Sequence, residues 1–398
     1  MTDSVLCINA GSSSIKFQMF EVSAGGALSF QFKGEIDGIG VQPRLKAENA
    51  TGDILVDQTY AASDVPDANA AVPKLAAWLR GNSGGAFPTV IGHRLVFGGT
   101  RYDAPTRITD EVLAYLERMV PLMPLHLPPE LAPIKAIASK LPEIPQVGVF
   151  DTSFHRGHAE IMQRFPLPDN FFQEGVLSYG YHGISYEFIS RTLPDVAPEL
   201  AAGHTIVAHL GSGCSMCAIQ GGKSVAASWG FSALDGLPMG TRPGRLDPGI
   251  LLYMLQVKKM STAEIEHLLY NECGLKALSG ISNDVRLLLN SDAPRAHIAL
   301  DIFALRCAQM VAELATAMGG FDGLVFTAGV GERAAPVRAA IGARLAWLGM
   351  EIDAAANERH GPRISTAKSR IACYVVPTNE ELMIAHHSLA LMHAKATS

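Results

Sequence analysis

Three glycine-containing turns follow stretches that are predicted to be strands, and their composition suits phosphate binding. They read NAGSSSIK (residues 9–16), HLGSGCS (209–215) and TAGVGER (327–333). Such turns present backbone N–H groups and hydroxyls to an anion without Cβ atoms in the way. None has the Walker A spacing or the complete dinucleotide fingerprint. Each alone could be an ordinary tight turn, but three in one chain predict a nucleotide or polyphosphate ligand rather than NAD.

Charged side chains in apolar or glycine-rich surroundings are the candidates for catalysis. Arg94 in GHRLVFGG and Arg242 in MGTRPGRLDP suit carboxylate or phosphoryl oxygens. Asp151 ends the apolar run QVGVF, where ligands of open α/β sheets bind. His182 is flanked by glycines and aromatics in YGYHG, although a lone histidine there is more often a satisfied core or turn residue. Glu380, just after YVVP, could hold Mg²⁺ or simply compensate a helix dipole.

The elements that must position these residues alternate between strands and helices. Apolar runs predict strands at 5–9, 89–92, 146–150, 205–210, 215–219, 323–327 and 371–376. Helical patterns cover 109–120, with Thr109 as N-cap, and also 296–318 and 379–394. The second helix is expected to bury the stripe Ile298, Ile302, Leu305, Ala308, Ala312 and Ala315. The alternation predicts an α/β protein.

A domain boundary is predicted near residue 150. The strand QVGVF ends there, a polar stretch containing proline follows over 155–175, and a second series of strands and glycine turns begins at 205. A chain of 398 residues is also long for a single core. We therefore expect a duplicated α/β unit with a cleft between its halves.

Composition and charge exclude several classes of protein. The net charge is −6 without blocks of like charge, which argues against sequence-independent binding of nucleic acid. No apolar run reaches the ~18 residues that span a bilayer, and the N-terminus MTDS lacks the basic region of a signal peptide. Six scattered cysteines fit a reducing compartment, and Cys214 and Cys217 lack the second pair that a zinc site needs. We expect a cytoplasmic protein with no membrane or nucleic-acid partner.

Taken together and in this order, the motifs resemble the acetate kinase family. The resemblance covers essentially the whole chain, through NAGSSSIK, GHRLVFGG, PLMPLHLP, VFDTSFH, YGYHGIS, HLGSG, GTRPGRLDPG, SGISNDVR, FTAGVGE and PTNEEL. It implies the fold of acetate and sugar kinases, heat-shock ATPases and actin, with two related ribonuclease H-like α/β domains around an active-site cleft. It implies domains at 1–150 and 151–385, the first rejoined by the C-terminal helix 386–398 and the second responsible for nucleotide binding and dimerisation.

The same resemblance implies reversible transfer of the γ-phosphoryl group of ATP to acetate, giving acetyl phosphate and ADP. Mg²⁺ or Mn²⁺ is the expected cofactor, and a short-chain carboxylate, ATP and a second copy in a homodimer are the expected partners. A loose phosphoryl-transfer transition state spreads negative charge over oxygens, which arginine, histidine and a metal ion can stabilise. Since a carboxylate is ionised near pH 7, Asp151 is expected to orient groups, directly or as an indirect metal ligand, rather than act as a base.

Carried over residue by residue, the resemblance implies a role for each matching position. The catalytic residues would be Asp151, His182 and Arg242, the substrate-binding residues Arg94, Val96, Leu125, Tyr181 and Ala233, and the metal ligands Asn9 and Glu380. The nucleotide-binding residues would be Ser12, Ser14, Lys16, His209, Gly211, Ser212, Gly213, Asp284, Arg286, Gly329, Gly331 and Glu332.

Some positions depart from the family pattern. The family usually has Asn at Ser212, His at Phe97, Asn at Leu127, basic residues at Leu177 and Ser178, and Asn at Arg333. No core catalytic position is lost, but nucleotide affinity and donor choice stay open. Tyr181 and Ala233 stand where acetate-selective members usually carry Phe and Pro. The Ala opens volume in the acyl pocket, so propionate is expected to be used comparably to acetate.

Three alternatives remain at this stage. A propionate, butyrate or branched-acid kinase of the same family would differ only in the acyl pocket. A nucleotide-gated binding protein like the heat-shock ATPases would carry a further partner-binding domain, for which the chain after PTNEEL is too short. A non-catalytic paralogue would fit the departures but not the retained Asn9, Arg94, Asp151, His182, Arg242 and Glu380.

Overall fold

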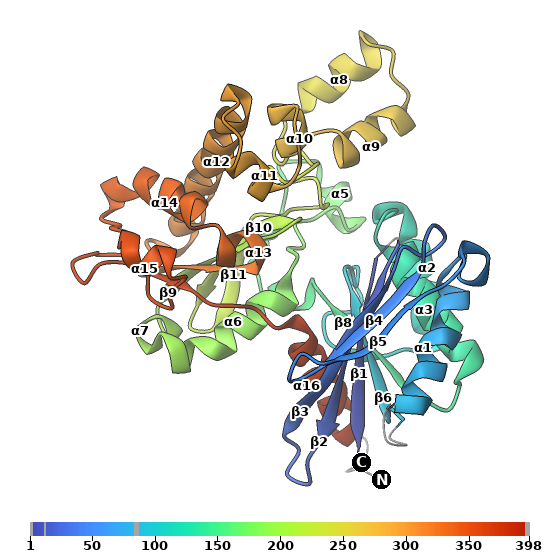
Figure 1. Ribbon diagram of the computed structural model, residues 1–398. Helices are drawn as coiled ribbons and strands as arrows, with labels where there is room; N and C mark the ends of the chain where they lie inside the picture. Colours follow the sequence, from blue (N-terminus) through green and yellow to red (C-terminus); the bar gives the residue numbers. More distant parts are fainter. Residues whose placement is uncertain (1–2, 12, 83–86, 395–398) are drawn as a thin grey trace. The chain divides into compact units, whose positions relative to one another are not determined.

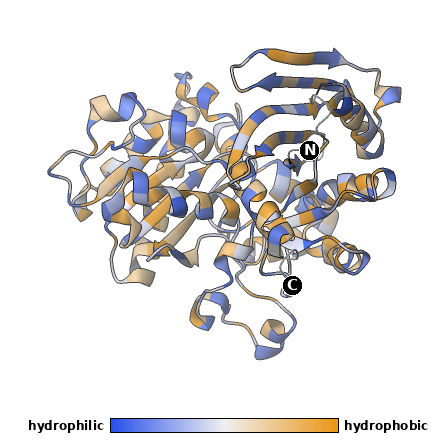
Figure 2. Cartoon of the chain, turned by 90° about the horizontal axis from the view of Figure 1, so that it is seen from below, coloured by the Kyte–Doolittle hydropathy of each residue, from blue (hydrophilic) through white to orange (hydrophobic). Residues whose placement is uncertain are grey.

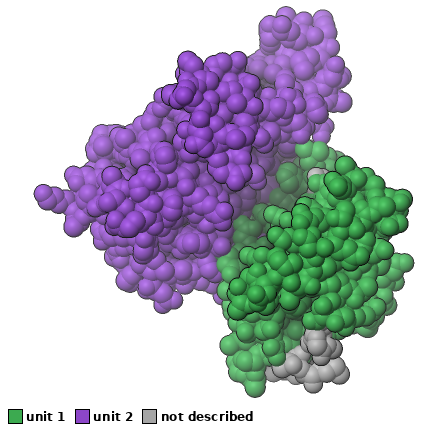
Figure 3. Space-filling model, viewed as in Figure 1, with its two compact units in different colours: residues 1–153, 379–398 green, residues 154–378 purple. Residues whose placement is uncertain are grey.

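The computed structural model describes residues 3–11, 13–82 and 87–394. The chain divides into two compact units, unit 1 (Met1–Ser153 with Asn379–Ser398) and unit 2 (Phe154–Thr378), coloured separately in Figure 3. The chain returns to unit 1 at Asn379, whereas the sequence places that return at residue 386. Among the described residues, no helix combines the length and apolar character needed to cross a membrane.

Unit 1 is a mixed sheet with helices packed against it (Figure 1). Its strand order is β5-β4-β3-β2-β1-β6-β8-β7, in which β1 is antiparallel to β2 but parallel to β6, and β6 is parallel to β8. The strands are β1 (Ser4–Ala10), β2 (Ile15–Val22), β3 (Leu28–Asp37), β4 (Arg44–Asn49), β5 (Ile54–Thr59), β6 (Val90–Leu95), β7 (Thr106–Arg107) and β8 (Gln146–Phe150). The helices are α1 (Ala68–Asn82), α2 (Asp110–Met119), α3 (Leu127–Lys140) and α16 (Glu380–Ala394).

The two faces of β1 pack against different helices, because successive side chains of a strand point to opposite sides of the sheet. Leu6 and Ile8 belong to a buried cluster with residues of α1 and α3. The other face lies against α16, because a Cβ on Gly92, which pairs with Cys7, would lie 2.6 Å from a methyl carbon of Ile384. Glycine at position 92 therefore permits the close approach of α16. Other strands of this sheet, such as β2, alternate between hydrophilic and hydrophobic residues along their length (Figure 2), as expected for strands with one packed face.

Unit 2 has a smaller sheet, β11-β10-β9-β12-β13. Its strands are β9 (His204–Leu210), β10 (Cys214–Gln220), β11 (Lys223–Ala227), β12 (Gly323–Thr327) and β13 (Ala372–Val375). The longer helices are α6 (Gly183–Val196), α8 (Pro248–Gln256), α9 (Thr262–Asn271), α12 (Pro294–Met318) and α14 (Ala335–Arg344). The shorter ones are α4 (Glu160–Gln163), α5 (Asp169–Gln173), α7 (Pro198–Ala201), α10 (Gly274–Ser279), α11 (Val285–Leu289), α13 (Ala328–Arg333) and α15 (Ala354–Glu358).

The two sheets repeat one topology, which confirms the predicted duplication of an α/β unit. β9 is antiparallel to β10 and parallel to β12, and β12 is parallel to β13, as in the series β1, β2, β6 and β8. The turn that follows β1 therefore corresponds to the turn that follows β9. Likewise, the segments that leave β6 and β8 correspond to those that leave β12 and β13. Several candidate residues, among them Arg94, Asp151 and Gly329, thus lie at or just beyond the carboxyl ends of parallel strands, where open α/β sheets bind ligands.

The predicted strands and helices are all present, with shifts of a few residues at their ends. Thr109 caps α2 as expected, accepting a hydrogen bond from the N–H of Val112. Of the stripe expected to be buried in α12, Ala308 is buried, but the prediction is wrong for Ile298 and Leu305, which are 54% and 44% exposed. The buried stripe is instead Ala299, Phe303, Cys307, Val311, Leu314 and Met318. The helix carries apolar residues on two faces, so their spacing alone did not identify the face that packs on the sheet.

Candidate active site

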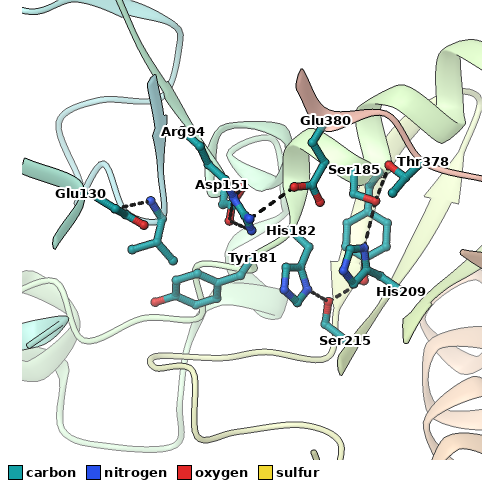
Figure 4. A network of polar contacts seen from close by, with 12 residues as sticks. Arg94, Glu130, Asp151, Tyr181, His182, Ser185, His209, Ser215, Thr378 and Glu380 are labelled. Carbon is teal, nitrogen blue, oxygen red and sulfur yellow. Dashed lines mark hydrogen bonds and ion pairs between the residues drawn. The ribbon is translucent and has the colours of Figure 1, made fainter. Parts of the chain in front are cut away.

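In unit 1, a buried cluster of charges forms around Arg94 (Figure 4). Arg94 lies near the end of β6, and its Nη2 donates to Asp151 Oδ2 at 2.8 Å, just beyond β8. The Nε of Arg94 lies 3.1 Å from the same oxygen, and Nη1 lies 3.3 Å from Glu380 Oε2 at the start of α16. Three candidate residues far apart in the sequence are thus brought together by parallel strands and a helix from the end of the chain.

The charges of this cluster stabilise one another. Burial alone would lower the pKa of the Arg94 guanidinium, but the carboxylates of Asp151 and Glu380 outweigh that effect and raise the pKa. Arg94 is therefore a permanent cation held in a defined orientation. A guanidinium fixed in this way can bind a planar carboxylate or phosphoryl group without first losing much side-chain entropy.

The proposed metal ligands lie on the α16 side of the same sheet. The Sγ of Cys7 donates to the carbonyl of Glu381 at 3.2 Å, so the first turn of α16 packs beside the end of β1, where Asn9 lies. Within the described part of the chain, no group of three or more His, Cys, Asp and Glu could hold a metal ion. An ion here would depend on the amide oxygen of Asn9, the carboxylate of Glu380, water and phosphate oxygens. That all-oxygen donor set fits Mg²⁺.

The first phosphate turn is only partly described. Ser12 lies outside the described residues, and the turn is closed by a hydrogen bond of 2.8 Å from the N–H of Gly11 to the carbonyl of Ser14. Lys16 lies beyond the turn on β2, where it lines a groove of about 260 Å³ with Lys33, Lys46 and Glu381. The structure therefore places Lys16 on an open face of the sheet rather than in the turn itself.

The unit 1 residues expected to line an acyl pocket differ in burial. Val96, directly after β6, is 6% exposed, and its N–H donates to Glu130 Oε2 of α3 at 3.0 Å. Leu125 is 43% exposed. Glu130 is buried and was not among the predicted residues, because no helix was predicted over α3 and a lone Glu gives no sign of burial. Phe97, one of the departures from the family pattern, is fully buried and so serves as core.

In unit 2, two histidines form the centre of a hydrogen-bonded cluster (Figure 4). The rings of His182 and His209 stack with centroids 4.1 Å apart. The Nδ1 of His182 lies 2.7 Å from Ser215 Oγ, which also bonds the hydroxyl of Tyr186. The Nδ1 of His209 lies 2.9 Å from Ser185 Oγ. Each imidazole is thus oriented by a hydrogen bond at Nδ1. In His182 this orientation turns Nε2 towards Gly213.

His182 and Arg242 converge on Gly213. A Cβ placed on Gly213 would lie 3.2 Å from His182 Nε2 and 3.0 Å from Arg242 Nη2. The guanidinium of Arg242 is held over the Trp229 ring at 5.1 Å and donates to the carbonyl of Ala233 at 2.9 Å. Burial lowers the pKa of Arg242. Two polar groups thus meet at a glycine of the phosphate-type turn HLGSG, an arrangement suited to holding a phosphoryl group.

A second layer supports the segment that carries His182. The backbone of His182 is left-handed, with φ of 57°, and Gly180 before it has φ of 73°. The Nε2 of His155 lies 3.0 Å from the carbonyl of Tyr181, so this nitrogen carries the hydrogen. Its Nδ1 lies 2.7 Å from Ser224 Oγ, which also bonds His158. Burial, aided by His158, lowers the pKa of His155 to about 3, so the ring stays neutral.

Tyr181 and Ala233, the unit 2 residues expected to line an acyl pocket, lie near Trp229 and Arg242. The hydroxyl of Tyr181 donates to the carbonyl of Phe231 at 2.9 Å, and its ring lies 5.4 Å from that of Trp229. Ala233 is fully buried. Trp229 was not among the candidates, although it contacts both His182 and Arg242. An aromatic residue outside the recognised motifs offered no signal for this role.

A cavity of about 650 Å³ in unit 2 is large enough for a nucleotide. Most expected nucleotide residues of this unit line it, together with Arg242: Gly211, Ser212, Asp284, Arg286 and Gly329. Asp284 caps α11 and pairs with Arg286 Nη2 at 2.6 Å. Of the departures from the family pattern, Ser212 and Arg333 line the cavity, whereas Leu177 is buried elsewhere. Only the first two can therefore affect a ligand in this cavity.

Gly331 and Glu332 form hydrogen bonds with other residues of unit 2 and do not line the cavity. The Oε1 of Glu332 accepts hydrogen bonds from the N–H groups of Ala328 at 2.9 Å and Thr378 at 3.3 Å. Ala328 has a left-handed backbone, with φ of 64°, which this contact helps to hold. The carbonyls of Gly331 and Glu332 accept from the buried guanidinium of Arg338. These residues therefore shape the turn that carries Gly329 rather than line the cavity.

Comparisons with known proteins identify the family of the chain. The model of the Acetokinase family matches residues 4–386. Acetate kinase of Nitrobacter hamburgensis is 50% identical over 396 residues, covering 100% of this chain and 98% of the relative. Acetate kinase of Rhizobium meliloti is 48% identical, with coverage of 98% and 99%.

Solved structures give the same result. The acetate kinase of Porphyromonas gingivalis matches with a TM-score of 0.86 and 34% identity, over 98% of this chain and 100% of that one. A propionate kinase from Francisella tularensis matches with a TM-score of 0.90 and 31% identity, over 98% and 99%. The fold is therefore that of the acetate kinases, with the actin-like ATPase architecture. From its motifs, its duplicated sheets and these matches over its whole length, the chain belongs to the acetokinase family.

Proposed function

We propose that the protein catalyses reversible, magnesium-dependent transfer of the γ-phosphoryl group of ATP to acetate, giving acetyl phosphate and ADP. The observation that carries this most directly is the convergence of His182 Nε2 and Arg242 Nη2 on Gly213 in unit 2. Arg242 also lines the nucleotide-sized cavity of that unit. The identity to curated acetate kinases supports acetate as the acceptor.

The chain's own residues would divide the reaction between them. Arg94 would bind the acetate carboxylate, with Asp151 holding its guanidinium in place. A carboxylate oxygen would attack the γ-phosphorus while the bond to the bridging oxygen of ADP breaks, so that no proton is transferred. His182 and Arg242 would donate hydrogen bonds to the phosphoryl oxygens as charge spreads over them. Asp284 and Arg286 would contact the nucleoside end of ATP.

Asn9 and Glu380 would hold the magnesium ion, which when bound neutralises charge on the phosphates. Their oxygen atoms are the ligand type that Mg²⁺ prefers, and the Arg94 contact keeps the Glu380 carboxylate oriented. Mn²⁺, with a similar preference for oxygen, would serve as well.

Trapping of the acyl phosphate with hydroxylamine tests the function. The purified protein with ATP, Mg²⁺ and each of a set of two- to five-carbon acids should give acetyl hydroxamate. No acyl hydroxamate from any acid would refute the acyl kinase assignment. Asn9→Ala and Glu380→Gln should raise the Mg²⁺ concentration needed for half-maximal rate. Unchanged values in both variants would refute the metal assignment.

Propionate is proposed as a second substrate. Ala233 is smaller than the Pro usual at this position in acetate-selective members, and one methylene in an apolar pocket changes binding by only ~1–3 kcal/mol. The kcat/KM for propionate should lie within about tenfold of that for acetate, a difference of ~1.4 kcal/mol. A larger deficit would reject the idea.

Homodimer formation and a cytoplasmic location complete the proposal. Helix α8 has no buried residue, and its side chains Leu252 and Tyr253 are 54% and 48% exposed, which supports a covering partner surface. Light scattering should give twice the mass of the chain, and Leu252→Glu should shift it towards the monomer. The six cysteines are all free thiols, which supports a reducing compartment.

A further inference from the structure

Glu130 is a buried carboxyl group that the proposed mechanism does not use. It lies in the first turn of α3 and is 8% exposed. Its Oε2 accepts a hydrogen bond of 3.0 Å from the N–H of Val96 (Figure 4). Val96 follows Arg94 by two residues and is the expected wall of the acyl pocket. A buried carboxyl is costly to a protein unless it is paired or neutral, so its presence beside the substrate-binding strand calls for a reason.

The hydrogen bond anchors the backbone where β6 ends. Beyond Leu95, the ladder that joins β6 to β8 stops, so the N–H of Val96 has no strand partner. The carboxyl of Glu130 takes that place and fixes the segment between Arg94 and the buried Phe97. A neutral carboxylic acid or an amide could accept this bond as well as a carboxylate, but an apolar side chain could not.

The electrostatic surroundings of Glu130 favour its neutral form. Burial raises the pKa of Glu130 to about 8, although the Val96 N–H and Arg94 act in the opposite direction. The like charge of Asp151 also contributes to this raised pKa. On the neighbouring β6, His93 is buried and bonds Gln146, and burial lowers its pKa to about 4, so it adds no charge. Glu117 on α2 is half exposed and paired with Lys135 on α3.

A bound carboxylate would act on Glu130 as Asp151 does. Acetate at Arg94 adds a negative charge and occupies the cation that partly stabilises an ionised Glu130. Binding and protonation are therefore coupled, and the coupling is reciprocal. An ionised Glu130 must weaken acetate binding by the same factor by which acetate disfavours ionisation.

We propose that Glu130 is a positioning residue of the carboxylate site. Glu130 anchors Val96, and the site binds acetate well only while the Glu130 carboxyl is protonated. This inference rests on the proposed function and assigns a residue to the control of its substrate affinity. The physical consequence is a loss of acetate affinity in mildly alkaline solution. The loss of affinity should affect acetate and not ATP, because the cavity for the nucleotide is built from other residues.

The test is the KM for acetate between pH 6.5 and 9.5, measured by ADP release at saturating ATP and Mg²⁺. If only the neutral form binds, KM rises by about twofold at the pKa of about 8 and by roughly tenfold one pH unit above it. Partial coupling gives a smaller rise, and we expect at least threefold between pH 7 and 9. The KM for ATP should not follow this curve. A change of less than twofold in the acetate KM of the wild type would overturn the proposal.

Three variants separate anchoring from charge. Glu130→Gln keeps an acceptor for the Val96 N–H but cannot ionise, so its acetate KM should have one value across the pH range. Glu130→Met removes the acceptor and should raise the acetate KM at every pH, relative to Glu130→Gln. Glu117→Gln, a matched change on the exposed side of the neighbouring helix, should keep the wild-type curve.

The outcomes distinguish this inference from the function on which it rests. Formation of acetyl phosphate by the wild type at pH 7 tests the function alone. An alkaline rise in KM that persists in Glu130→Gln shows that another group titrates, and it overturns the inference while leaving the function intact. If Glu130→Met does not fold, the comparison between wild type and Glu130→Gln still decides the role of the charge.

Discussion

Replacement of Arg94 by alanine should damage both substrate binding and stability, because the side chain compensates two carboxylates. Asp151 is 1% exposed and Glu380 is 11% exposed at its side chain, and both depend on the guanidinium for a counter-charge. Removal of one partner from a buried ion pair costs about 3–5 kcal/mol. In a unit of this size, 1 kcal/mol corresponds to roughly 2–4 °C in Tm, so the variant should melt about 10 °C lower.

The loss in binding is of similar size. A charge-assisted contact to a carboxylate costs about 2–5 kcal/mol when it is removed and the substrate instead meets two acids that have lost the guanidinium. Since ~1.4 kcal/mol is a factor of ten, the KM for acetate should rise by about 30-fold or more. The KM for ATP should change far less, because the nucleotide cavity contains no part of the Arg94 cluster.

A double-mutant cycle tests whether Arg94 compensates the charge of Asp151. Asp151→Asn removes the negative charge of the more buried acid, so the double variant Arg94→Ala, Asp151→Asn should be more stable than Arg94→Ala alone. Thermal unfolding measures stability, and ADP release at varied acetate measures KM. If Arg94→Ala melts within about 2 °C of the wild type and its acetate KM changes less than threefold, the cluster neither compensates charge nor binds substrate as we argue.

Three further outcomes follow from the same geometry. Arg242→Ala should lower kcat far more than it raises the acetate KM, and the opposite pattern would exchange its role with that of Arg94. Gly213→Ala should lower kcat with little change in Tm, because its Cβ would lie 3.0 Å from Arg242 Nη2 and displace the guanidinium; an unchanged kcat would contradict this. The third concerns stability. Because native Glu130 has a pKa of about 8 against 4.5 when unfolded, the native state binds more protons between these values, and stability falls as pH rises through this window. Glu130→Gln lacks this loss and should exceed the wild type by up to about 5 kcal/mol at pH 9, measured by urea unfolding; equal stability would rule out the raised pKa.

Much of the fold could be predicted because its signals are local. The runs at 5–9, 146–150, 205–210 and 323–327 are mostly apolar, as expected of strands buried on both faces. Six strands in the described part of the chain were not predicted: β2, β3, β4, β5, β7 and β11. The strands β3, β4 and β5 were missed because they mix polar and apolar residues and carry no turn motif. The α12 stripe was misplaced because a helix with apolar residues on two faces does not reveal which face is covered.

The sequence by itself determined the α/β class, the duplicated arrangement and the residues around which the chemistry is built, because strand periodicity and glycine-rich turns are written in consecutive residues. The tertiary structure alone decided how those residues are held. Asp151 and Glu380 meet Arg94 through strand register and the return of α16, and Trp229 and Ser215 reach Arg242 and His182 through packing. Glu130 shows the difference most clearly, since its burial against Val96 arises from the packing of α3 on β6, which no local pattern encodes.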